Sequence, residues 1–332
     1  MDNQKTQLLY LHRYLYGGGT TFTAHLVHTI MKPNETVISR VRKSTKLELK
    51  LRDFGYGLRY QNINPISLKK VRYPFITLFT LDYSNILPEL NRARRNLNDV
   101  IVVIHDPTHI SQKVLAAIKK WKIITIRKTV QHYIQSRFGL QPHFLYHPFH
   151  SYPTVSHNDR IYAISISRIS YEKNTEIILR ANRILNISQA IRIYGTPRRL
   201  FYLLKRQNLD FNRYYYGQFE KSFYKLSEIL SRAKFVVDLS VLKNDGGGTQ
   251  YTFLEAIHNG CALIVHRKWL DGIDPKYCDL KEGYNCFAVE NEKELADIIK
   301  ADPDTTNIVN NAKKLMRRHI RANWSHLFHN MN

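Results

Sequence analysis

The sequence alternates short, β-branched apolar runs with segments of helical periodicity, and it does so twice. Each alternation predicts parallel strands joined by helices, because a strand that is apolar along its whole length must be covered on both faces. In the first half the strand candidates are 7–12, 36–41, 75–80, 100–104, 122–126 and 143–146. The helix candidates there are 21–31, which Pro33 ends, and 111–121, with Ser111 as its expected N-cap.

The alternation restarts after the Pro- and His-containing stretch 147–159. Its strand candidates are 161–167, 191–195, 213–217, 235–240 and 261–265, with helices expected near 174–185, 197–207, 221–232 and 250–259. Gly260 follows the last of these helices, where a left-handed residue is expected. The chain is therefore predicted to be α/β, with two Rossmann-like, doubly wound parallel-sheet domains that face one another across an interdomain cleft.

The predicted domains are residues 1–150 and residues 151–332, the second ending in a helix. With 332 residues and 43% hydrophobic content, the chain is long enough for two cores of ordinary size. A hairpin is expected on the first domain, where segments 47–52 and 56–61 alternate polar and apolar residues and are joined through residues 53–55.

Positive charge is unevenly distributed along the chain. Of the net charge of +23, +15 falls in residues 1–150 and +8 in residues 151–332. A field of this size attracts polyanions such as nucleic acid or an anionic membrane surface, although a basic surface that serves only solubility would look the same. Basic side chains that could follow phosphates in the first domain are Arg40, Arg42, Lys43, Lys46, Lys69, Lys70, Arg72, Arg92, Arg94 and Arg95, with Tyr56, Tyr60 and Tyr73 as aromatic neighbours.

Several classes of protein are not indicated. The sequence has no apolar run of about 18 residues, and its N-terminus lacks the order of a signal peptide, so a cytoplasmic location is expected. Its three cysteines, Cys261, Cys278 and Cys286, lack the number and spacing of a disulfide framework or a zinc site. No Asp-x-Asp pair is placed to hold a metal, so no metal is expected to be required.

Residues 241–265, VLKNDGGGTQYTFLEAIHNGCALIV, place a glycine-rich loop directly before a helix. Here Gly246, Gly247 and Gly248 would let main-chain N–H groups approach an anion, and the helix N-terminus adds unpaired donors and a positive dipole end. A diphosphate fits that description. Glu255, one turn into the helix, could accept hydrogen bonds from two ribose hydroxyls. The alternative is a flexible loop with a solvated glutamate, and the motif is not a Walker loop because the Gly-Lys-Ser/Thr ending is absent.

Two further polar motifs follow strands, at the edge where open α/β sheets bind ligands. Arg168 and Lys173, in SRISYEKN, could both reach one pyrophosphate and stabilise the charge on a departing nucleotide. The alternative is an ordinary exposed basic pair. His105 and Asp106 follow the most apolar strand and could orient an acceptor hydroxyl or assist its deprotonation. Asp106 could also cap the turn that Pro107 opens.

A second glycine-rich loop, Gly17, Gly18 and Gly19 within RYLYGGGTTF, lies between a predicted strand and a predicted helix. It lacks the GxGxxG spacing of a dinucleotide-binding loop. We interpret it as a bare loop lining the cleft, where an acceptor or a sugar passes close to the backbone because no Cβ is in the way.

Taken in this order, the motifs resemble those of GT-B glycosyltransferases, and in particular the retaining enzymes of glycosyltransferase family four. The resemblance covers nearly the whole chain: the first glycine loop, the His-Asp pair, the R-x4-K segment and the block GTQYTFLEAIHNGCALIV. It implies that Glu255 binds the ribose of a nucleotide-sugar donor. It also implies that Arg168 and Lys173 bind the diphosphate, that Tyr251 and Thr252 contact its phosphate end, and that the His-Asp pair lies near the transferred sugar.

One departure from the family lies eight residues before Glu255. The family usually has a second glutamate there, whereas this sequence has Gly247, with Asp245 close enough to substitute for it. Three features are similar to those of phage DNA α-glucosyltransferases, which modify hydroxymethylated bases. They are this departure, the segment YTFLE and the basic first domain. The expected reaction is transfer of a hexose or pentose from a UDP-sugar, UDP-glucose first among them, to a hydroxymethylated base in DNA, with no cofactor.

Two other interpretations stay open. A peripheral membrane glycosyltransferase could use the same basic face on anionic lipid and modify a glycolipid or polysaccharide, although no strongly amphipathic segment is seen. A nucleic-acid-binding protein on an inactive transferase fold is supported only by the missing glutamate. If the chain is an enzyme, none of the motifs contains an obvious covalent nucleophile, so retention through front-face departure of the diphosphate is expected.

Overall fold

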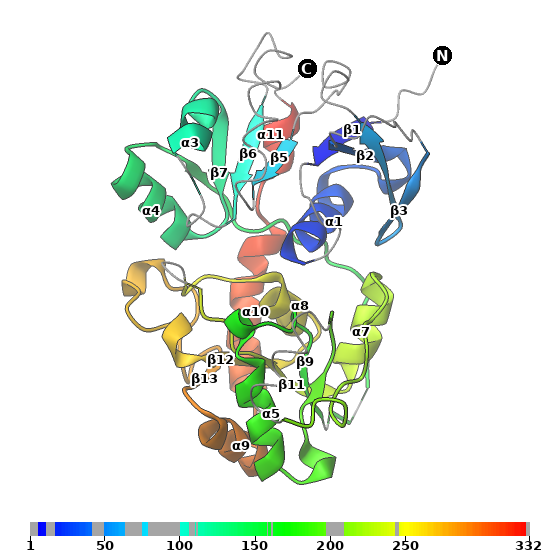
Figure 1. Ribbon diagram of the computed structural model, residues 1–332, viewed down its shortest axis with the longest axis vertical. Coiled ribbons are helices and arrows are strands. Elements are labelled where there is room, and N and C mark those ends of the chain that lie inside the picture. Colours follow the sequence, from blue (N-terminus) through cyan, green and yellow to red (C-terminus); the bar gives the residue numbers. More distant parts are fainter. Residues whose placement is uncertain are drawn as a thin grey trace. The chain divides into compact units, whose positions relative to one another are not determined.

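The computed structural model describes residues 6–10, 17–41, 50–63, 75–78, 100–105, 110, 112–157, 159–160, 162–196, 209–242 and 246–329. The chain divides into two compact units: unit 1 comprises residues 1–150 and 319–332, and unit 2 comprises residues 151–318 (Figure 1). The division expected from the sequence assigned all of 151–332 to the second domain. The structure instead groups the chain from His319 onward with unit 1.

Within its described residues, unit 1 forms two four-stranded sheets, of order β1-β2-β4-β3 and β5-β6-β7-β8. The strands are β1 (Thr6–Tyr10), β2 (Thr36–Val41), β3 (Arg52–Gly55), β4 (Leu58–Ile63), β5 (Phe75–Leu78), β6 (Ile101–Ile104), β7 (Lys122–Thr125) and β8 (His143–Phe144). Every pairing is parallel except that of β3 with β4. β1 and β5 lie next to each other, so the two sheets meet at these edges.

Several helices are described in unit 1, and two of them, α3 and α4, pack on an apolar core around β6. The described helices are α1 (Gly18–Ile30), α3 (Gln112–Ile118), α4 (Lys128–Phe138) and α11 (Ser325–His329), with the 3-10 turn η1 (Pro33–Glu35). β6 is buried along its whole length, and its Val102 and Ile104 pack with Ile118 of α3 and Ile134 of α4. Cover on both faces explains why this strand shows no polar alternation.

β3 and β4 form the expected antiparallel hairpin, but the predicted position of its turn is wrong. The turn consists of Tyr56 and Gly57, at φ +58° and +73°, and not of residues 53–55, which belong to β3. Two successive residues with positive φ make the tight turn whose twist matches that of paired strands. Asp53 accepts a hydrogen bond of 2.8 Å from the N–H of Gly55, which fixes the end of β3 before that turn.

Within its described residues, unit 2 forms one five-stranded parallel sheet, of order β10-β9-β11-β12-β13. The strands are β9 (Tyr162–Ser165), β10 (Arg192–Ile193), β11 (Ala233–Asp238), β12 (Ala262–His266) and β13 (Phe287–Val289). Val237 of β11 and Ile264 of β12 are fully buried in the core. The α/β prediction with parallel sheets is thus confirmed.

Helices pack against this sheet along the rest of unit 2. They are α5 (Thr175–Ile184), α7 (Phe223–Ser231), α8 (Tyr251–His258), α9 (Glu292–Ala301) and α10 (Thr306–Ile320), with the 3-10 turns η6 (Tyr171–Lys173), η7 (Ile187–Gln189), η8 (Arg267–Trp269) and η9 (Pro275–Tyr277). α5 and α9 lie side by side, whereas α8 contacts β11 and β12 (Figure 1). Gly260, after α8, has the expected left-handed φ of +75°. In the part of the chain that the structure describes, no helix has the length and apolar character needed to cross a membrane.

Several sequence expectations lie outside the described residues. They are the helix at 197–207, the N-cap Ser111, the acids Asp106 and Asp245, and, among the side chains expected to contact nucleic acid, Arg42, Lys43, Lys46, Lys69, Lys70, Arg72, Tyr73, Arg92, Arg94 and Arg95. The prediction of a strand at 213–217 is wrong. Only Tyr215 makes a β-bridge, to Ile193, and β10 is itself two residues long. The preceding backbone turns, with the N–H of Tyr214 donating to the carbonyl of Phe211 at 3.1 Å. Tyrosines have high strand propensity, but without a long partner edge they cannot form a strand.

Candidate functional site

The strand order of unit 2 defines a switch point between β9 and β11. These two strands are neighbours, and the chain leaves β9 toward β10 on one side and β11 toward β12 on the other. Loops that diverge in this way leave a crevice at the carboxyl ends of the strands, where open α/β sheets bind ligands. The Arg168–Lys173 segment follows β9, and the glycine loop with α8 follows β11.

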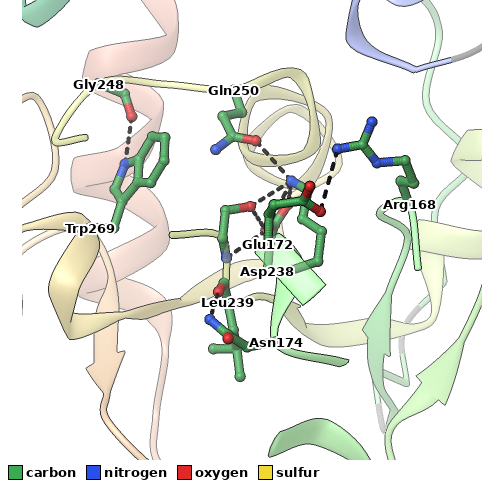
Figure 2. Close-up of polar contacts among 10 residues, drawn as sticks. Arg168, Glu172, Asn174, Asp238, Leu239, Gly248, Gln250 and Trp269 are labelled. Carbon is green, nitrogen blue, oxygen red and sulfur yellow. Dashed lines mark hydrogen bonds and ion pairs between the residues drawn. The ribbon is translucent and has the colours of Figure 1, made fainter. Parts of the chain in front are cut away.

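The two loops at the switch point are held together by two hydrogen bonds, one from a side chain and one between backbone groups. Asn174, which is held in the left-handed conformation at φ +46°, donates from Nδ2 to the carbonyl of Leu239 at 2.7 Å. The N–H of Val241 donates to the carbonyl of Glu172 at 2.9 Å. These bonds position the polar side chains of both loops against each other (Figure 2).

Lys173 directs its ammonium onto the end of β11. Its Nζ donates to the Asp238 carboxylate at 3.1 and 3.3 Å, to Gln250 Oε1 at 2.9 Å, and to Ser240 Oγ. The Asp238 side chain is fully buried and that of Lys173 is 13% exposed. The Asp238 carboxylate also accepts from the backbone N–H of Ser240 at 3.1 Å. These additional hydrogen bonds matter because the desolvation of two charges otherwise offsets their attraction.

Arg168 lies closer to solvent than Lys173. Its guanidinium is 3.9 Å from the Glu172 carboxylate, and the two side chains are 46% and 41% exposed. An ion pair this exposed contributes at most about 1 kcal/mol. The guanidinium can therefore turn toward an anionic ligand at little cost. Figure 2 shows Arg168 and Glu172 beside Asp238 and Gln250, at the ends of the two strands.

The glycine loop is packed tightly against the segment that follows β12. The N–H of Gly247 donates to the carbonyl of Trp269 at 2.6 Å, and the N–H of Gly248 to that of Gly246 at 2.7 Å. In return, Trp269 Nε1 donates to the carbonyl of Gly248 at 2.9 Å. A Cβ on Gly246 would lie 2.7 Å from the Trp269 carbonyl oxygen. Close packing thus requires these glycines. Two of the loop N–H groups that the sequence assigned to an anion already have protein acceptors, that of Gly247 in η8 and that of Gly248 within the loop.

The N-terminus of α8 begins at Gln250, whose side chain makes no capping hydrogen bond. Tyr251, the first helical residue, is buried, and burial followed by the nearby Glu255 carboxylate raises the pKa of its phenol well above 10. The phenol therefore stays protonated at neutral pH. Thr252 is the second helical residue. A helix N-terminus carries partial positive charge.

Glu255 is buried, and its carboxylate is bonded within unit 2. Its Oε2 accepts a hydrogen bond from the Tyr152 hydroxyl, which in turn accepts from Asn259 Nδ2 at 3.1 Å. Tyr152 stacks on Phe223 of α7 with ring centroids 4.7 Å apart, and its carbonyl oxygen bonds His258 Nε2 at 2.8 Å. The glutamate thus anchors the first residues of unit 2 to α8.

His105 follows β6 in unit 1, in a cluster of buried histidines. Its ring packs edge-on against Phe22, at 4.7 Å between centroids, and its carbonyl accepts from the Arg127 guanidinium. Burial, followed by the charges of His319, Arg127, His105 and His25, lowers the pKa of His147 well below 6.5. Asp106 and Asp245, the two acids predicted beside the site, lie outside the described residues.

The motif of Gly17, Gly18 and Gly19, which was predicted to be a loop before a helix at 21–31, instead forms the start of α1. Gly17 is the N-cap, with φ +83°, and Gly18 and Gly19 are the first two helical residues. A Cβ on Gly17 or Gly18 would meet no atom within 4 Å. At Gly17 the backbone conformation requires glycine, whereas Gly18 leaves open space in front of the helix N-terminus.

Asp238, Ser240 and Gln250, which contact Lys173 among the described residues, were not predicted from the sequence. A signal was present, because Asp238 is a charged residue inside the apolar run FVVDLS. A buried carboxylate needs a cationic partner, so this residue pointed to a nearby lysine or arginine. Nothing in the local pattern identified Lys173 as that partner.

The comparisons with known proteins concern the fold. No family model matches the chain, and no curated protein matches it in sequence. HepE from Anabaena, solved with UDP and glucose, aligns with TM-score 0.66 and 16% identity over 94% of this chain and 95% of its own. An α-glucosyltransferase solved with UDP and a 13-mer DNA containing a HMU base aligns with TM-score 0.65 and 13% identity, over 98% and 97%. A glycosyltransferase from Rickettsia africae aligns with TM-score 0.60 and 10% identity, over 97% and 95%.

These alignments extend over nearly the full length of each chain. At such low identity they establish the fold, and the fold is that of GT-B glycosyltransferases, as the sequence predicted. What the site itself does depends on the chemistry of its own residues.

Proposed function

We propose that this chain is a glycosyltransferase that transfers a sugar from a UDP-sugar, UDP-glucose in the first instance, to a hydroxyl acceptor. The observation that carries the proposal is the pair of basic side chains at the switch point, Arg168 and Lys173, beside the uncapped N-terminus of α8. Two cations and a helix N-terminus at one point favour a diphosphate. HepE has been solved with UDP-glucose, and the α-glucosyltransferase with UDP.

In this proposal unit 2 holds the donor. The diphosphate contacts Arg168, Lys173 and the first turn of α8 at Tyr251 and Thr252. Glu255 accepts the ribose hydroxyls, and it then shares its carboxylate with the Tyr152 hydroxyl or releases that hydroxyl. Gly246, Gly247 and Gly248 bring the loop backbone to the donor, with Asp245 next to them.

We further propose that unit 1 binds the acceptor and that the acceptor is a hydroxymethylated base in DNA. Two observations support this choice: +15 of the net charge falls in residues 1–150, and an α-glucosyltransferase with the same fold holds DNA with an HMU base. His105 and Asp106 would orient the acceptor hydroxyl, near the glycines at the start of α1. A base within a duplex must be extruded, or approached through the major groove, before it reacts.

The proposed chemistry is transfer with retention of configuration. The bond between the sugar C1 and the diphosphate oxygen breaks, and its electron pair stays on the diphosphate. The acceptor oxygen bonds to C1 from the same face, and its proton passes to the departing diphosphate. Arg168, Lys173 and the α8 amides would stabilise the leaving group as its charge develops.

The test is mass spectrometry of nucleosides from DNA containing hydroxymethylated pyrimidines, after incubation with the protein and a panel of nucleotide sugars. A hexose or pentose mass added to the base is the expected result, and it would name the donor. Slow hydrolysis of one nucleotide sugar without addition to DNA would reject the DNA acceptor and favour a glycolipid or polysaccharide. If no nucleotide sugar is bound or consumed, the glycosyltransferase proposal fails.

The donor site has its own test in Arg168→Ala and Lys173→Ala. Both variants are expected to lower kcat/KM at least tenfold, because a charge-assisted hydrogen bond to a phosphate contributes about 1.5–3 kcal/mol. Arg168→Ala is the cleaner of the two, since this exposed side chain contributes little to folding. Near-normal turnover in both would reject the assignment of these residues to the diphosphate.

A further inference from the structure

The ammonium of Lys173 has no hydrogen left for a ligand in the described state. An ammonium has three N–H donors, and Lys173 Nζ is already within hydrogen-bond distance of both Asp238 oxygens, Ser240 Oγ and Gln250 Oε1. A phosphate oxygen can therefore reach this ammonium only if one of these acceptors leaves. The proposed donor site is in this sense occupied by the protein's own side chains.

Gln250 is the acceptor that can leave at least cost. Asp238 is charged, fully buried and held by the N–H of Ser240. Its separation from Lys173 would therefore leave a buried carboxylate without a cationic partner. Ser240 Oγ also donates to Asp238, which ties it to the same carboxylate. Gln250 offers a neutral amide oxygen from the opposite loop, on the N-cap residue of α8.

The nitrogen of the same amide, Gln250 Nε2, provides a second and independent observation. Gln250 Nε2 is buried and, among the residues that the structure describes, has no hydrogen-bond partner. A buried donor without an acceptor is unfavourable, and such atoms in folded proteins call for a missing partner. This donor lies at the N-terminus of α8, where the side chain makes no capping bond, beside the cations of the switch point (Figure 2).

We propose that Gln250 is a placeholder which the donor's diphosphate replaces. A phosphate oxygen takes the position of Gln250 Oε1 on Lys173, and Gln250 turns its Nε2 donor to the same diphosphate. Asp238 and Ser240 stay on Lys173 throughout and position it. The exchange supplies the buried amide with an acceptor and keeps Lys173 fully bonded with and without donor. This inference rests on the proposed function, because it assumes that a nucleoside diphosphate binds at the switch point.

The test is calorimetric titration of the full chain with UDP, which needs no acceptor and no turnover. Gln250→Glu has nearly the same shape, but it holds Lys173 with a charge and has no N–H to offer. We expect it to bind UDP at least about tenfold more weakly than the wild type, because a charge-assisted bond is lost and a carboxylate faces the diphosphate. Its melting temperature without UDP should equal or exceed that of the wild type.

The matched control is Gln189→Glu, which makes the same change of charge in η7, before β10 and therefore at the opposite end of the strands. It should bind UDP like the wild type. Equal UDP affinity in Gln250→Glu and the wild type would overturn the proposal that the diphosphate replaces Gln250 on Lys173. A loss of affinity that accompanies a loss of thermal stability would also overturn it. If the wild type itself does not bind UDP, the proposed function fails, which is a different outcome from either of these.

Discussion

At the scale of single residues, the buried pair of Lys173 and Asp238 is the feature on which the site depends most. Its two members, one in η6 and the other at the end of β11, are 65 positions apart in the sequence, and the carboxylate has no contact with solvent. A buried pair of this kind contributes little compared with two apolar residues, but removal of one partner leaves an uncompensated charge. Its role is to hold a cation in place at the ends of β9 and β11.

This asymmetry predicts how the pair responds to mutation. Lys173→Met should lower the free energy of unfolding by about 3–5 kcal/mol, because it leaves the Asp238 carboxylate buried without a cationic partner. The double variant Lys173→Met/Asp238→Asn should recover most of that loss, since the amide still accepts the N–H of Ser240 without a charge. Urea denaturation followed by circular dichroism measures both. A double variant as unstable as the single one would contradict the buried-charge argument.

At the scale of elements, the packing of the loop before α8 leaves no room at Gly247 for the glutamate that the resemblance to family four implies there. This residue has φ +66°, and a Cβ there would lie 3.0 Å from both Cys278 Sγ and Ile273 Cγ2. Its carbonyl also accepts from the N–H groups of Asp279 and Leu280, at 2.8 and 3.2 Å. A glutamate cannot be accommodated in this loop conformation.

A side chain at Gly247 would destabilise the fold in two ways, through the left-handed backbone and through crowding of its Cβ. The variants Gly247→Ala and Gly272→Ala separate these two effects. Both glycines have a left-handed φ, of +66° and +72°, but a Cβ on Gly272 would meet nothing within 4 Å. Each alanine should cost about 1–2 kcal/mol for the left-handed backbone. Gly247→Ala should cost clearly more, and should weaken UDP binding, because the Cβ displaces the segment around Cys278. Thermal denaturation compares the two variants, and equal losses would show that the loop is not crowded.

At the scale of the whole molecule, the histidines of unit 1 link its stability to pH. His147 is buried, and its carbonyl lies 3.3 Å from His319 Nδ1, on the last turn of α10. Its pKa is well below 6.5 in the folded state, first through burial and then through the neighbouring charges of His319, Arg127, His105 and His25. The unfolded chain therefore binds a proton at this residue below pH 6.5 that the folded chain does not bind.

Stability should accordingly fall as the pH is lowered. The contribution of His147 is fully present above pH 6.5 and is lost progressively below it, with a slope of up to about 1.4 kcal/mol per pH unit for one proton. His147→Gln should flatten this dependence between pH 7.5 and 5.5 relative to the wild type. Its matched control is His143→Gln, a change at an exposed position of the same unit. Parallel curves of urea midpoint against pH for His147→Gln and the wild type would contradict the assignment.

The sequence by itself determined the order of strands and helices and the position of the motifs between them. The apolar runs at 36–41 and 122–126 became β2 and β7, and the segment around 250–259 became α8. These features are local: period and propensity decide them over a few residues. Because parallel strands end at a common edge, the same pattern also indicated that the segments after β9 and β11 would share one end of a sheet.

Only the tertiary structure decided which groups meet there. Tyr152 and Glu255 are 103 positions apart, and no periodicity in either segment predicts their hydrogen bond. The same holds for Lys173 with Gln250, 77 positions apart, and for the use of the Gly247 N–H by Trp269. A hydrophobic pattern predicts which face of an element is buried. The order of the strands and the packing of the helices decide which other element contacts that face. The chemistry of the site arises from those long-range contacts.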